Sequence, residues 1–571
     1  MPIRYFMTLL AFCSMSSAVI AQTSYKLPET VKVDPAALNA EPVCDPIISA
    51  AWRQAQEIDG VKIRASERCN PDNPALIAAV VKGTNNISMS TLMQTNLSAD
   101  TIIKTDDIDG DGDPDRIIIK LEVMELNGPS PDFEGLIPTF DIAPGIQPGA
   151  WVFAPKTRGM STENFESVRA NALLRLPSPV IRVEQGDIVQ IVLENTHYLP
   201  HTIHLHGVDH PYTHADEHVD GGDGVPQTNE IFLMPGEKRI YEFQPRQTGT
   251  MLYHCHVQTH THLAMGLVGM IIIEENRPNN WLQTLNVGAG HVRHPSVAIQ
   301  EEFDHEYDLH YHAMDKELTE IIQKYNDPRL VARDMNRLYD ITDSTEDYYM
   351  LNGLSFPYTL RESLIVVEPD QKVKLRVANT ASEMLSMHTH GHKATITHYD
   401  GIEHNPAAQI QRDVYALSAA QRIDLTLNTT NDGLNSYGEG IWLFHDHREK
   451  GITNNGMNPG GNVSAIVYKN YLNEIGLPNG QGSDISKYFT KEFHARILPI
   501  WQDLDEVGTL GTAGEQSGMD PASRTAFFNL LAGLLVGILI YMVLIKRKKA
   551  SQIVTRTTTM LKGSKGSTNN E

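Results

Sequence analysis

Ten of the 24 histidines fall into four short clusters, and each cluster contains a His-x-His pair. Side chains two positions apart on a β-strand project from the same face, so each pair sets two imidazoles side by side. Imidazole suits copper, iron, nickel and zinc. The pairs are His204/His206, His254/His256, His388/His390 and His445/His447. The pattern therefore predicts a mainly β protein that binds transition metal ions through eight nitrogen ligands.

Cys255 narrows the choice of metal, because it stands between the two histidines of the second pair and points to the opposite face. That face is the interior of its own unit. His201, His260 and the weak thioether of Met265 would complete a trigonal site there with a long axial ligand. This donor set is typical of blue copper.

These residues resemble the hallmark motifs of the multicopper oxidases, a family built from cupredoxin-like Greek-key β-sandwiches. The motifs H-x-x-H-x-H-G, H-C-H-x-x-x-H-x-x-x-x-M, H-x-H-G and H-x-H all occur within residues 136–470. The resemblance implies four coppers per chain: type 1 copper at His201, Cys255, His260 and Met265, type 2 copper at His204 and His388, and a type 3 pair at His206, His254, His256, His390, His445 and His447.

The resemblance also implies the chemistry. Electrons from a donor reach the type 1 copper one at a time and pass from Cys255 to His254 and His256, and dioxygen is reduced to water at the other three coppers. Asp223 resembles the family's acidic residue near the type 2 copper, where it orients a ligand or relays protons. The alternatives are a copper nitrite reductase, whose motif has Ala in place of His256, and a non-catalytic copper-binding or copper-resistance protein.

The second unit lacks every strong type 1 ligand. Leu385, Asp446 and Gly451 stand where the first unit has His201, Cys255 and His260. Such a chain is similar to two-domain oxidases with type 1 copper in the first domain, and to nitrite reductases in which neighbouring subunits of a trimer face each other. A homotrimer with clusters at its interfaces is implied, and the sequence leaves open whether the cluster forms within or between chains.

The ends of the chain indicate export and anchoring. Residues 1–21 have the pattern of a cleaved signal peptide, and residues 526–545 form an apolar run long enough to cross a bilayer. The basic tail that follows, 546–571, should stay cytoplasmic, which puts the body on the outer, periplasmic or extracellular, face. In that oxidising compartment Cys44 and Cys69 are a plausible disulfide. A net charge of −23 excludes a basic nucleic-acid binder.

The predicted organisation is mainly β. The segments in order are a signal peptide (1–21), an N-terminal region (22–135), a first cupredoxin domain (136–276), a second cupredoxin domain (297–470), a linker (471–525), a transmembrane helix (526–545) and a cytoplasmic tail (546–571). Helical spacing predicts an insertion at about 315–338 inside the second domain.

An acidic loop in the N-terminal region has the spacing of a calcium loop, with Gly112 at position 6 and Ile118 in place of the usual Glu at position 12. Its carboxylates are Asp107, Asp109, Asp111, Asp113 and Asp115. Calcium is predicted here, and the alternative is a solvated acidic turn.

A second acidic segment concerns the electron donor. Asp216, Glu217 and Asp220 lie among His210, His214 and His218. These three histidines, together with His262, fit no family position, and we expect them to lie around the metal ligands or on the surface. Carboxylates and imidazoles suit a reducing metal ion such as Cu(I), Fe(II) or Mn(II), or a basic protein donor such as a reduced cupredoxin, better than an anion. A phenolic donor is the second hypothesis, and a solvated loop is the alternative to both.

Overall fold

The computed structural model describes residues 101–495 with short gaps, two strands at 56–58 and 61–63, and a helix at 529–549. The gaps are 131, 158, 160, 209, 211–220, 278–279, 281–283, 293–302, 481 and 483. The predicted signal peptide, Cys44, Cys69 and the acidic residues Asp216, Glu217 and Asp220 therefore lie outside the described residues.

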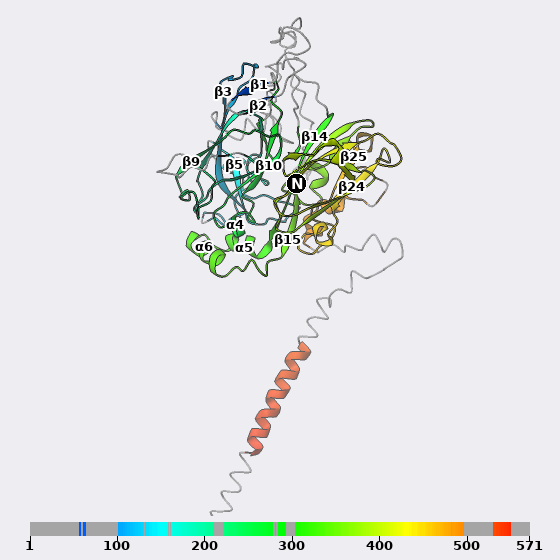
Figure 1. Cartoon of the computed structure of the whole chain (residues 1–571). Coiled ribbons are helices and arrows are strands. Elements are labelled where there is room, and N and C mark those ends of the chain that lie inside the picture. Colours follow the sequence, from blue (N-terminus) through cyan, green and yellow to red (C-terminus); the bar gives the residue numbers. More distant parts are fainter. Residues whose placement is uncertain are drawn as a thin grey trace, which may run out of the picture. The chain divides into compact units, whose positions relative to one another are not determined.

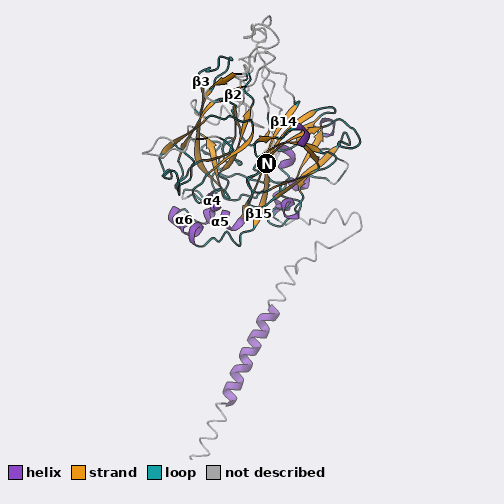
Figure 2. Cartoon of the chain, in the orientation of Figure 1, coloured by secondary structure: helices purple, strands orange, loops and turns teal. Residues whose placement is uncertain are grey.

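The first sandwich consists of two five-stranded sheets (Figures 1 and 2). In order across the first sheet, the strands are β12 (Leu285–Asn286), β6 (Val180–Glu184), β11 (Val268–Glu274), β10 (Gly249–His254) and β8 (His204–His206). The second sheet has the order β3 (Ile102–Thr105), β4 (Arg116–Leu126), β7 (Ile188–Glu194) and β9 (Lys238–Phe243), with β5 (Ala150–Pro155) paired to β4. A further short hairpin joins β1 (Gln56–Ile58) to β2 (Val61–Ile63).

The first sandwich begins before residue 136, where the sequence placed its boundary. Strand β4 runs parallel to β7, with Ile119 opposite Ile191, and antiparallel to β5. Buried and half-buried positions alternate along most of β4, as expected for a strand with one face on a core. Residues 102–126 are thus an integral part of the first domain.

The second sandwich pairs an eight-stranded sheet with a five-stranded one. The larger sheet has the order β13 (Gly290–His291), β14 (His305–Asp315), β17 (Lys372–Asn379), β23 (Arg422–Asn428), β19 (Ala394–Tyr399) and β20 (Ile402–Glu403), with β15 (Glu346–Leu351) on β14 and β21 (Ile410–Arg412) on β19. The smaller has the order β16 (Ile365–Val367), β25 (Ser464–Tyr468), β24 (Ile441–Asp446), β18 (Leu385–Thr389) and β22 (Val414–Leu417). Two β-sandwiches in one mainly β body confirm the predicted fold class.

The predicted helical insertion is α5 (Lys316–Lys324) followed by α6 (Pro328–Arg337). The side chains of Asp315 and Asp327 cap the two helices by accepting hydrogen bonds from backbone N–H groups. Leu318, Ile322 and Met335 join the core of the first sandwich, so an insertion from the second domain covers part of the first.

The shorter helices are α4 (Thr259–His262), α7 (Thr359–Glu362) and α8 (Lys491–His494), with 3₁₀ turns η1 (Pro406–Ala408), η2 (Glu449–Ile452), η3 (Lys469–Tyr471) and η4 (Ser486–Phe489). The Tyr488 ring packs on Phe356, and Phe493 is buried. The predicted linker 471–525 is therefore partly folded onto the body, at least as far as His494. A separate unit contains the helix Asn529–Lys549, which is long and apolar enough to cross a membrane.

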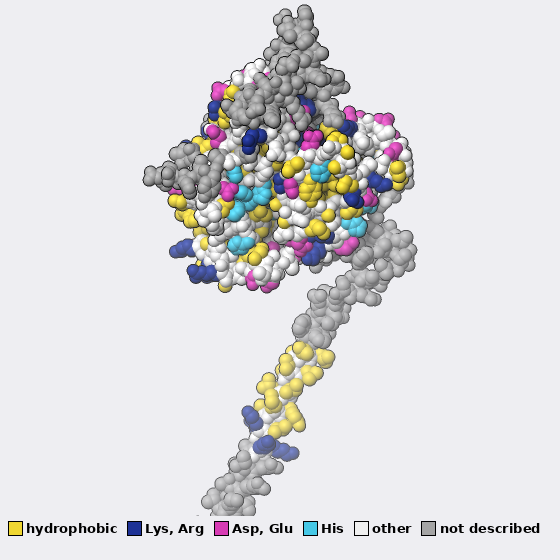
Figure 3. Space-filling view, in the orientation of Figure 1, with side chains coloured by type: hydrophobic (Ala, Val, Ile, Leu, Met, Phe, Trp, Pro, Cys, Tyr) yellow, Lys and Arg dark blue, Asp and Glu magenta, His cyan; other side chains and the backbone are white. Residues whose placement is uncertain are grey.

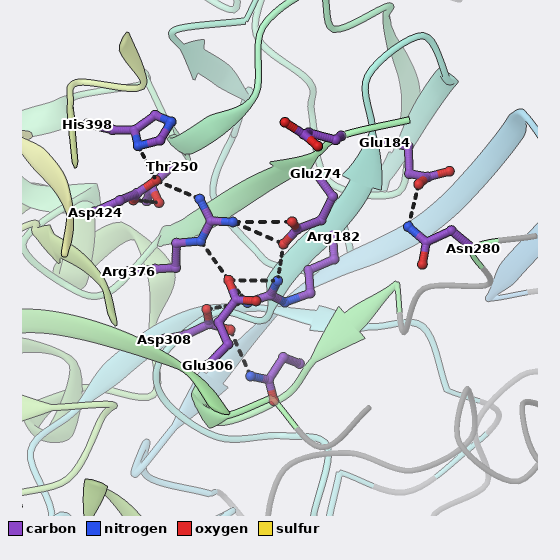
Figure 4. Close-up of polar contacts among 12 residues, drawn as sticks. Arg182, Glu184, Thr250, Glu274, Asn280, Glu306, Asp308, Arg376, His398 and Asp424 are labelled. Atoms are coloured by element: carbon purple, nitrogen blue, oxygen red, sulfur yellow. Dashed lines mark hydrogen bonds and ion pairs between the residues drawn. The ribbon is translucent and has the colours of Figure 1, made fainter. Parts of the chain in front are cut away.

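A buried network of charged side chains joins the two sandwiches (Figure 4). Arg182 on β6 pairs with Glu274 at 2.6 Å and with Asp308 of the second domain at 2.5 Å. Arg376 on β17 pairs with Asp424 and Glu306, each at 2.6 Å, and reaches Glu274 of the first domain at 3.1 Å. The network fixes one sandwich against the other.

Replacing Arg376 by Met should destabilise the body by about 3–5 kcal/mol, because Asp424 and Glu306 would keep buried charges without this partner. Lys469→Met is the control, since Lys469 and Glu368 form an exposed ion pair whose loss should cost less than about 1 kcal/mol. Chemical unfolding of both variants measures the difference. Equal midpoints would contradict the structural role of the network.

Candidate metal centre

The four His-x-His pairs lie on two equivalent pairs of strands. In the first domain β8 pairs with β10, which sets His204 opposite His254. In the second domain β18 pairs with β24, which sets His388 opposite His445. The predicted pairs therefore come together two by two, and each domain contributes one group of four imidazoles.

Backbone carbonyls orient the histidines of the first group. His204 Nδ1 donates to the carbonyl of Asp223 at 2.7 Å, and His254 Nδ1 donates to that of Cys255 at 2.9 Å. A neutral imidazole that donates from Nδ1 presents a lone pair at Nε2. The Nε2 atoms of His206 and His254 lie 3.0 Å apart, so a cation that binds between them would be held by both.

The second group repeats this arrangement. His388 Nδ1 donates to the Asp413 carbonyl at 2.8 Å, and His445 Nδ1 donates to that of Asp446 at 2.9 Å. The Nε2 atoms of His390 and His445 lie 3.2 Å apart, and the ring of His447 stacks on that of His445.

Burial favours the neutral form of three histidines in the first group, His206, His254 and His256. It lowers the pKa of His206 to about 4 and that of His254 to about 3, and neighbouring histidines contribute to both shifts. Burial also lowers the pKa of His256 and of His390. Uncharged imidazoles at neutral pH are the form that binds metal ions.

The two groups lie in different domains of the chain. Among the described residues, no hydrogen bond or ring contact joins a histidine of the first group to one of the second. Figure 3 shows histidine side chains reaching the surface in several distinct places. Each group alone offers four of the eight imidazoles.

The thiol of Cys255 lies in a buried site beside the first group. Its Sγ is 3.5 Å from His201 Nδ1 and 3.5 Å from His262 Nδ1. His262 is 1% exposed, whereas the expected ligand His260 faces solvent. The structure thus puts His262, and not His260, beside the thiol.

These residues fit copper. Met265 is fully buried in the same core cluster as Cys255, as expected for an axial thioether. Burial raises the pKa of Cys255 to about 12, lowers the pKa of His262 to about 3, and holds the pKa of His201 well below its usual range. A cation that displaces the thiol proton would therefore meet one thiolate and two neutral imidazoles, which are the blue-copper donors.

The sequence did not reveal the side chains that surround the candidate ligands of this site. His197 Nδ1 lies 2.9 Å from His201 Nε2, and the Tyr198 hydroxyl donates to Glu125 at 2.6 Å. His197 also lines a cavity of about 790 Å³ with Glu194, Lys238 and others. The cavity thus comes within one hydrogen bond of a candidate copper ligand.

The equivalent place in the second domain is filled by an ion pair. The buried carboxylate of Asp446 pairs with Arg448 at 2.8 Å, and a Cβ added at Gly451 would clash with that carboxylate at 2.4 Å. Leu385, which stands where the first domain has His201, is fully buried.

Asp223 lies beside the first group, as predicted. Its Oδ1 is 3.2 Å from His204 Nδ1 and 2.9 Å from His210 Nε2. His210, which fitted no family position, therefore belongs to the site through this carboxylate. His214 and His218 lie outside the described residues.

The predicted calcium loop connects β3 and β4. Carboxylate oxygens of Asp107, Asp109 and Asp115 lie within 4.8 Å of one another. Asp111, Asp113 and Asp115 are all buried, and the carboxylates of Asp111 and Asp113 are not part of this group of three.

Comparisons with known proteins agree with the motifs. Residues 171–278 and 331–458 match two profiles described as multicopper oxidase. Laccase-3 of Botryotinia fuckeliana is 32% identical over 114 residues, which are 19% of this chain and 23% of that protein. Copper resistance protein A of Pseudomonas syringae pv. tomato is 23% identical over 286 residues, 47% of this chain and 43% of that protein. The chain spans less than half the length of these curated relatives.

Among solved structures, a blue copper oxidase from Nitrosomonas europaea aligns at 23% identity and a TM-score of 0.45, over 66% of this chain and 94% of that one. Both matched segments contain the histidine groups described above. Two segments of the chain, residues 171–278 and 331–458, therefore match the multicopper oxidase family.

Proposed function

We propose that this protein couples the one-electron oxidation of a donor at a type 1 copper to the four-electron reduction of dioxygen to water at a trinuclear copper cluster. The observation that carries the proposal is the position of Cys255. Its sulfur lies in a buried site with two imidazoles, and its backbone carbonyl accepts a hydrogen bond from His254, which belongs to the first histidine group. Copper would supply the redox chemistry.

The residues of the chain have distinct roles in this proposal. Cys255, His201, His262 and Met265 hold the type 1 ion. The eight paired histidines hold the other three copper ions, which makes four coppers per chain in total. Backbone carbonyls fix the tautomers of the histidines that donate to them. Asp223 would orient His204 and relay protons near the type 2 ion.

A complete cluster needs both histidine groups, and among the described residues no hydrogen bond or ring contact joins them within one chain. We therefore propose a homotrimer in which the first domain of one chain faces the second domain of the next. Closed ring symmetry gives every subunit an identical interface of this kind.

The donor is a low-valent metal ion in our first hypothesis and a phenol in our second, with a reduced cupredoxin as a protein donor. The names of two relatives, copper resistance protein A and laccase, correspond to these classes. The cavity beside His197 contains both acidic and basic side chains, among them Glu194, Glu237 and Lys238, and is a candidate point of electron transfer. The acidic residues 216, 217 and 220 lie outside the described part.

We propose that the helix Asn529–Lys549 anchors the body to the cytoplasmic membrane, with the body on the outer face after cleavage of residues 1–21. Lys546 and its basic neighbours follow the apolar run, which favours a cytoplasmic tail.

Oxygen uptake by the copper-loaded protein tests the function. Phenols, Cu(I), Fe(II), Mn(II) and a reduced cupredoxin are offered as donors, with nitrite as a second acceptor. Four donor electrons per dioxygen support the proposal. Turnover with nitrite alone would indicate a nitrite reductase, and copper binding without turnover would indicate a copper-storage or resistance protein.

Replacing Asp223 by Asn should lower oxygen uptake by about 10–100-fold, the usual effect of losing an outer partner of a metal ligand. Asp413→Asn is the matched control. Asp413 holds His388 through its backbone carbonyl, which the substitution keeps, so oxygen uptake should stay within about twofold of wild type. Equal losses in both variants would contradict the role of the Asp223 carboxylate.

A further inference from the structure

The carboxylate of Glu125 brings three aromatic side chains together beside the buried thiol site. Glu125 lies near the end of β4, opposite Trp151 on β5. Its Oε2 accepts hydrogen bonds from the Trp151 indole N–H at 3.0 Å and from the Tyr198 hydroxyl at 2.6 Å. The Nε2 atom of His197 lies 3.8 Å from the same oxygen. A Cβ added at Gly128 would clash with Oε1, so a glycine at this position leaves room for the carboxylate.

The same aromatic side chains border the candidate copper ligands. His197 Nδ1 is 2.9 Å from His201 Nε2, and the ring of Trp151 stands edge-on to that of His262, with the centroids 5.2 Å apart. Trp151 is fully buried and His197 is 4% exposed. Because little water screens these rings, a charge at one end of the contact acts on the other end.

The turn that carries His197 is held by local hydrogen bonds. Asn195 Oδ1 accepts a hydrogen bond from the His197 backbone N–H at 3.0 Å. The amide of Asn195 donates to the carbonyls of Leu199 and Leu233. His201 exchanges two backbone hydrogen bonds with Leu233. The two imidazoles are therefore fixed relative to each other by the backbone, and not only by their own contact.

The charge of Glu125 selects one arrangement of protons on the two histidines. In a neutral imidazole one ring nitrogen carries the proton and the other accepts. A proton on His197 Nε2 is attracted by the carboxylate, and Nδ1 is then free to accept from His201 Nε2–H. A proton on His197 Nδ1 would leave the Nε2 lone pair facing a negative oxygen, which is repulsive. His197 Nε2 is buried and has no hydrogen-bond partner among the described residues, so no hydrogen bond competes with this effect.

The favoured arrangement is the one that a metal site needs. His201 then carries its proton on Nε2, and its Nδ1, which lies 3.5 Å from the sulfur of Cys255, keeps a lone pair for a metal ion. A carboxylate or another acceptor on the outer nitrogen also makes a metal-binding imidazole a stronger electron donor. Stronger donation and a nearby negative charge both stabilise Cu(II) more than Cu(I), because the ion of higher charge gains more from them.

We propose that Glu125 and His197 are positioning residues of the type 1 site. Glu125 fixes the tautomer of His197, His197 fixes that of His201, and the carboxylate lowers the reduction potential of the copper at Cys255. This inference rests on the proposed function, since it needs a type 1 copper. It extends that function by assigning the control of the potential to two residues that bind no metal themselves.

Redox titration of the visible copper band, in the full-length copper-loaded protein in detergent, tests the proposal. Glu125→Gln keeps the side-chain shape and removes the charge. It should raise the ratio of Cu(I) to Cu(II) at a fixed potential about tenfold, which for one electron is a rise in potential of about 59 mV. Glu122→Gln is the matched control. Glu122 lies on the same strand but accepts hydrogen bonds from Thr157, so the ratio should change by less than about twofold.

A second variant tests the relay through the imidazole. His197→Phe keeps a ring and removes both nitrogens, so His201 loses the acceptor of its outer N–H. The copper affinity of the type 1 site should fall about 10–100-fold, as measured by competition with a chelator while the visible band is followed. Adding Glu125→Gln to this variant should change the potential less than it does in wild type, because the two residues act in one chain.

Two results would overturn the proposal. Equal shifts in Glu125→Gln and Glu122→Gln would show only a general effect of net charge. Full additivity of Glu125→Gln and His197→Phe would show that the carboxylate does not act through His197. A wild-type protein that binds copper without any visible band would instead contradict the proposed function, and this inference with it.

Discussion

Replacing Cys255 by Ser should abolish the intense visible absorption of the copper-loaded protein and reduce oxygen uptake to background. The absorption of blue copper comes from a thiolate bound to Cu(II), and a serine hydroxyl stays protonated and cannot replace it. The eight paired histidines remain, so metal analysis should still find about three coppers per chain. A band that survives in this variant would refute the type 1 site.

A pair of histidine variants sharpens this test. His262→Gln should lose the same band, because His262 Nδ1 lies 3.5 Å from the sulfur. His260→Gln should keep the band, because His260 faces solvent. If His260→Gln loses the band and His262→Gln keeps it, His260 is the ligand, as the family motif implies. That result would contradict the structure at this point.

The spacing of the His-x-His pairs was sufficient to predict the two histidine groups, because a strand repeats every two residues. The second imidazole of the thiol site could not be predicted in the same way. His260 and His262 lie on one short helical turn, α4, where positions two apart point in nearly opposite directions. Gln258 precedes that turn in the left-handed region, at φ 46°. The direction of the turn, and not the motif, decides which histidine faces inward.

The start of the first domain could not be predicted for a different reason. The run of isoleucines at 117–119 indicated a strand, and it pairs with the nearby β3 on one side. Its neighbour on the other side is β7, about 70 residues later, and a pairing that distant leaves no local signal. The calcium site in the acidic loop stays a prediction. Asp113 in this loop accepts a hydrogen bond from the Asn280 backbone N–H, a contact over 167 residues that the sequence does not reveal.

The residues that surround the candidate copper ligands could be predicted only in part from the sequence. Asp223 stood in a recognisable position, and the structure puts its carboxylate beside His204. His197 and Glu125 carried no such signal, since their role depends on packing around Trp151 and Tyr198. Sequence motifs identify groups that bind a metal directly, whereas the groups that orient these ligands are set by the fold.

Two variants that are each inactive should restore activity when they are combined in one trimer. His204→Gln with His206→Gln removes half of the first histidine group, and His445→Gln with His447→Gln removes half of the second. Each variant alone has no complete cluster, so oxygen uptake should fall to background. In a mixed trimer, the intact first domain of one chain can meet the intact second domain of the next.

Random mixing of equal amounts gives an intact interface about one time in four, because each of its two halves is intact in half of the chains. Co-expression with two different tags, followed by purification on both, should therefore recover a substantial fraction of wild-type oxygen uptake. A wild-type protein that is monomeric by light scattering yet fully active, together with a mixture that stays inactive, would show that the cluster forms within one chain. Since no contact joins the two histidine groups among the described residues of a single chain, we expect the neighbouring subunit to complete each cluster.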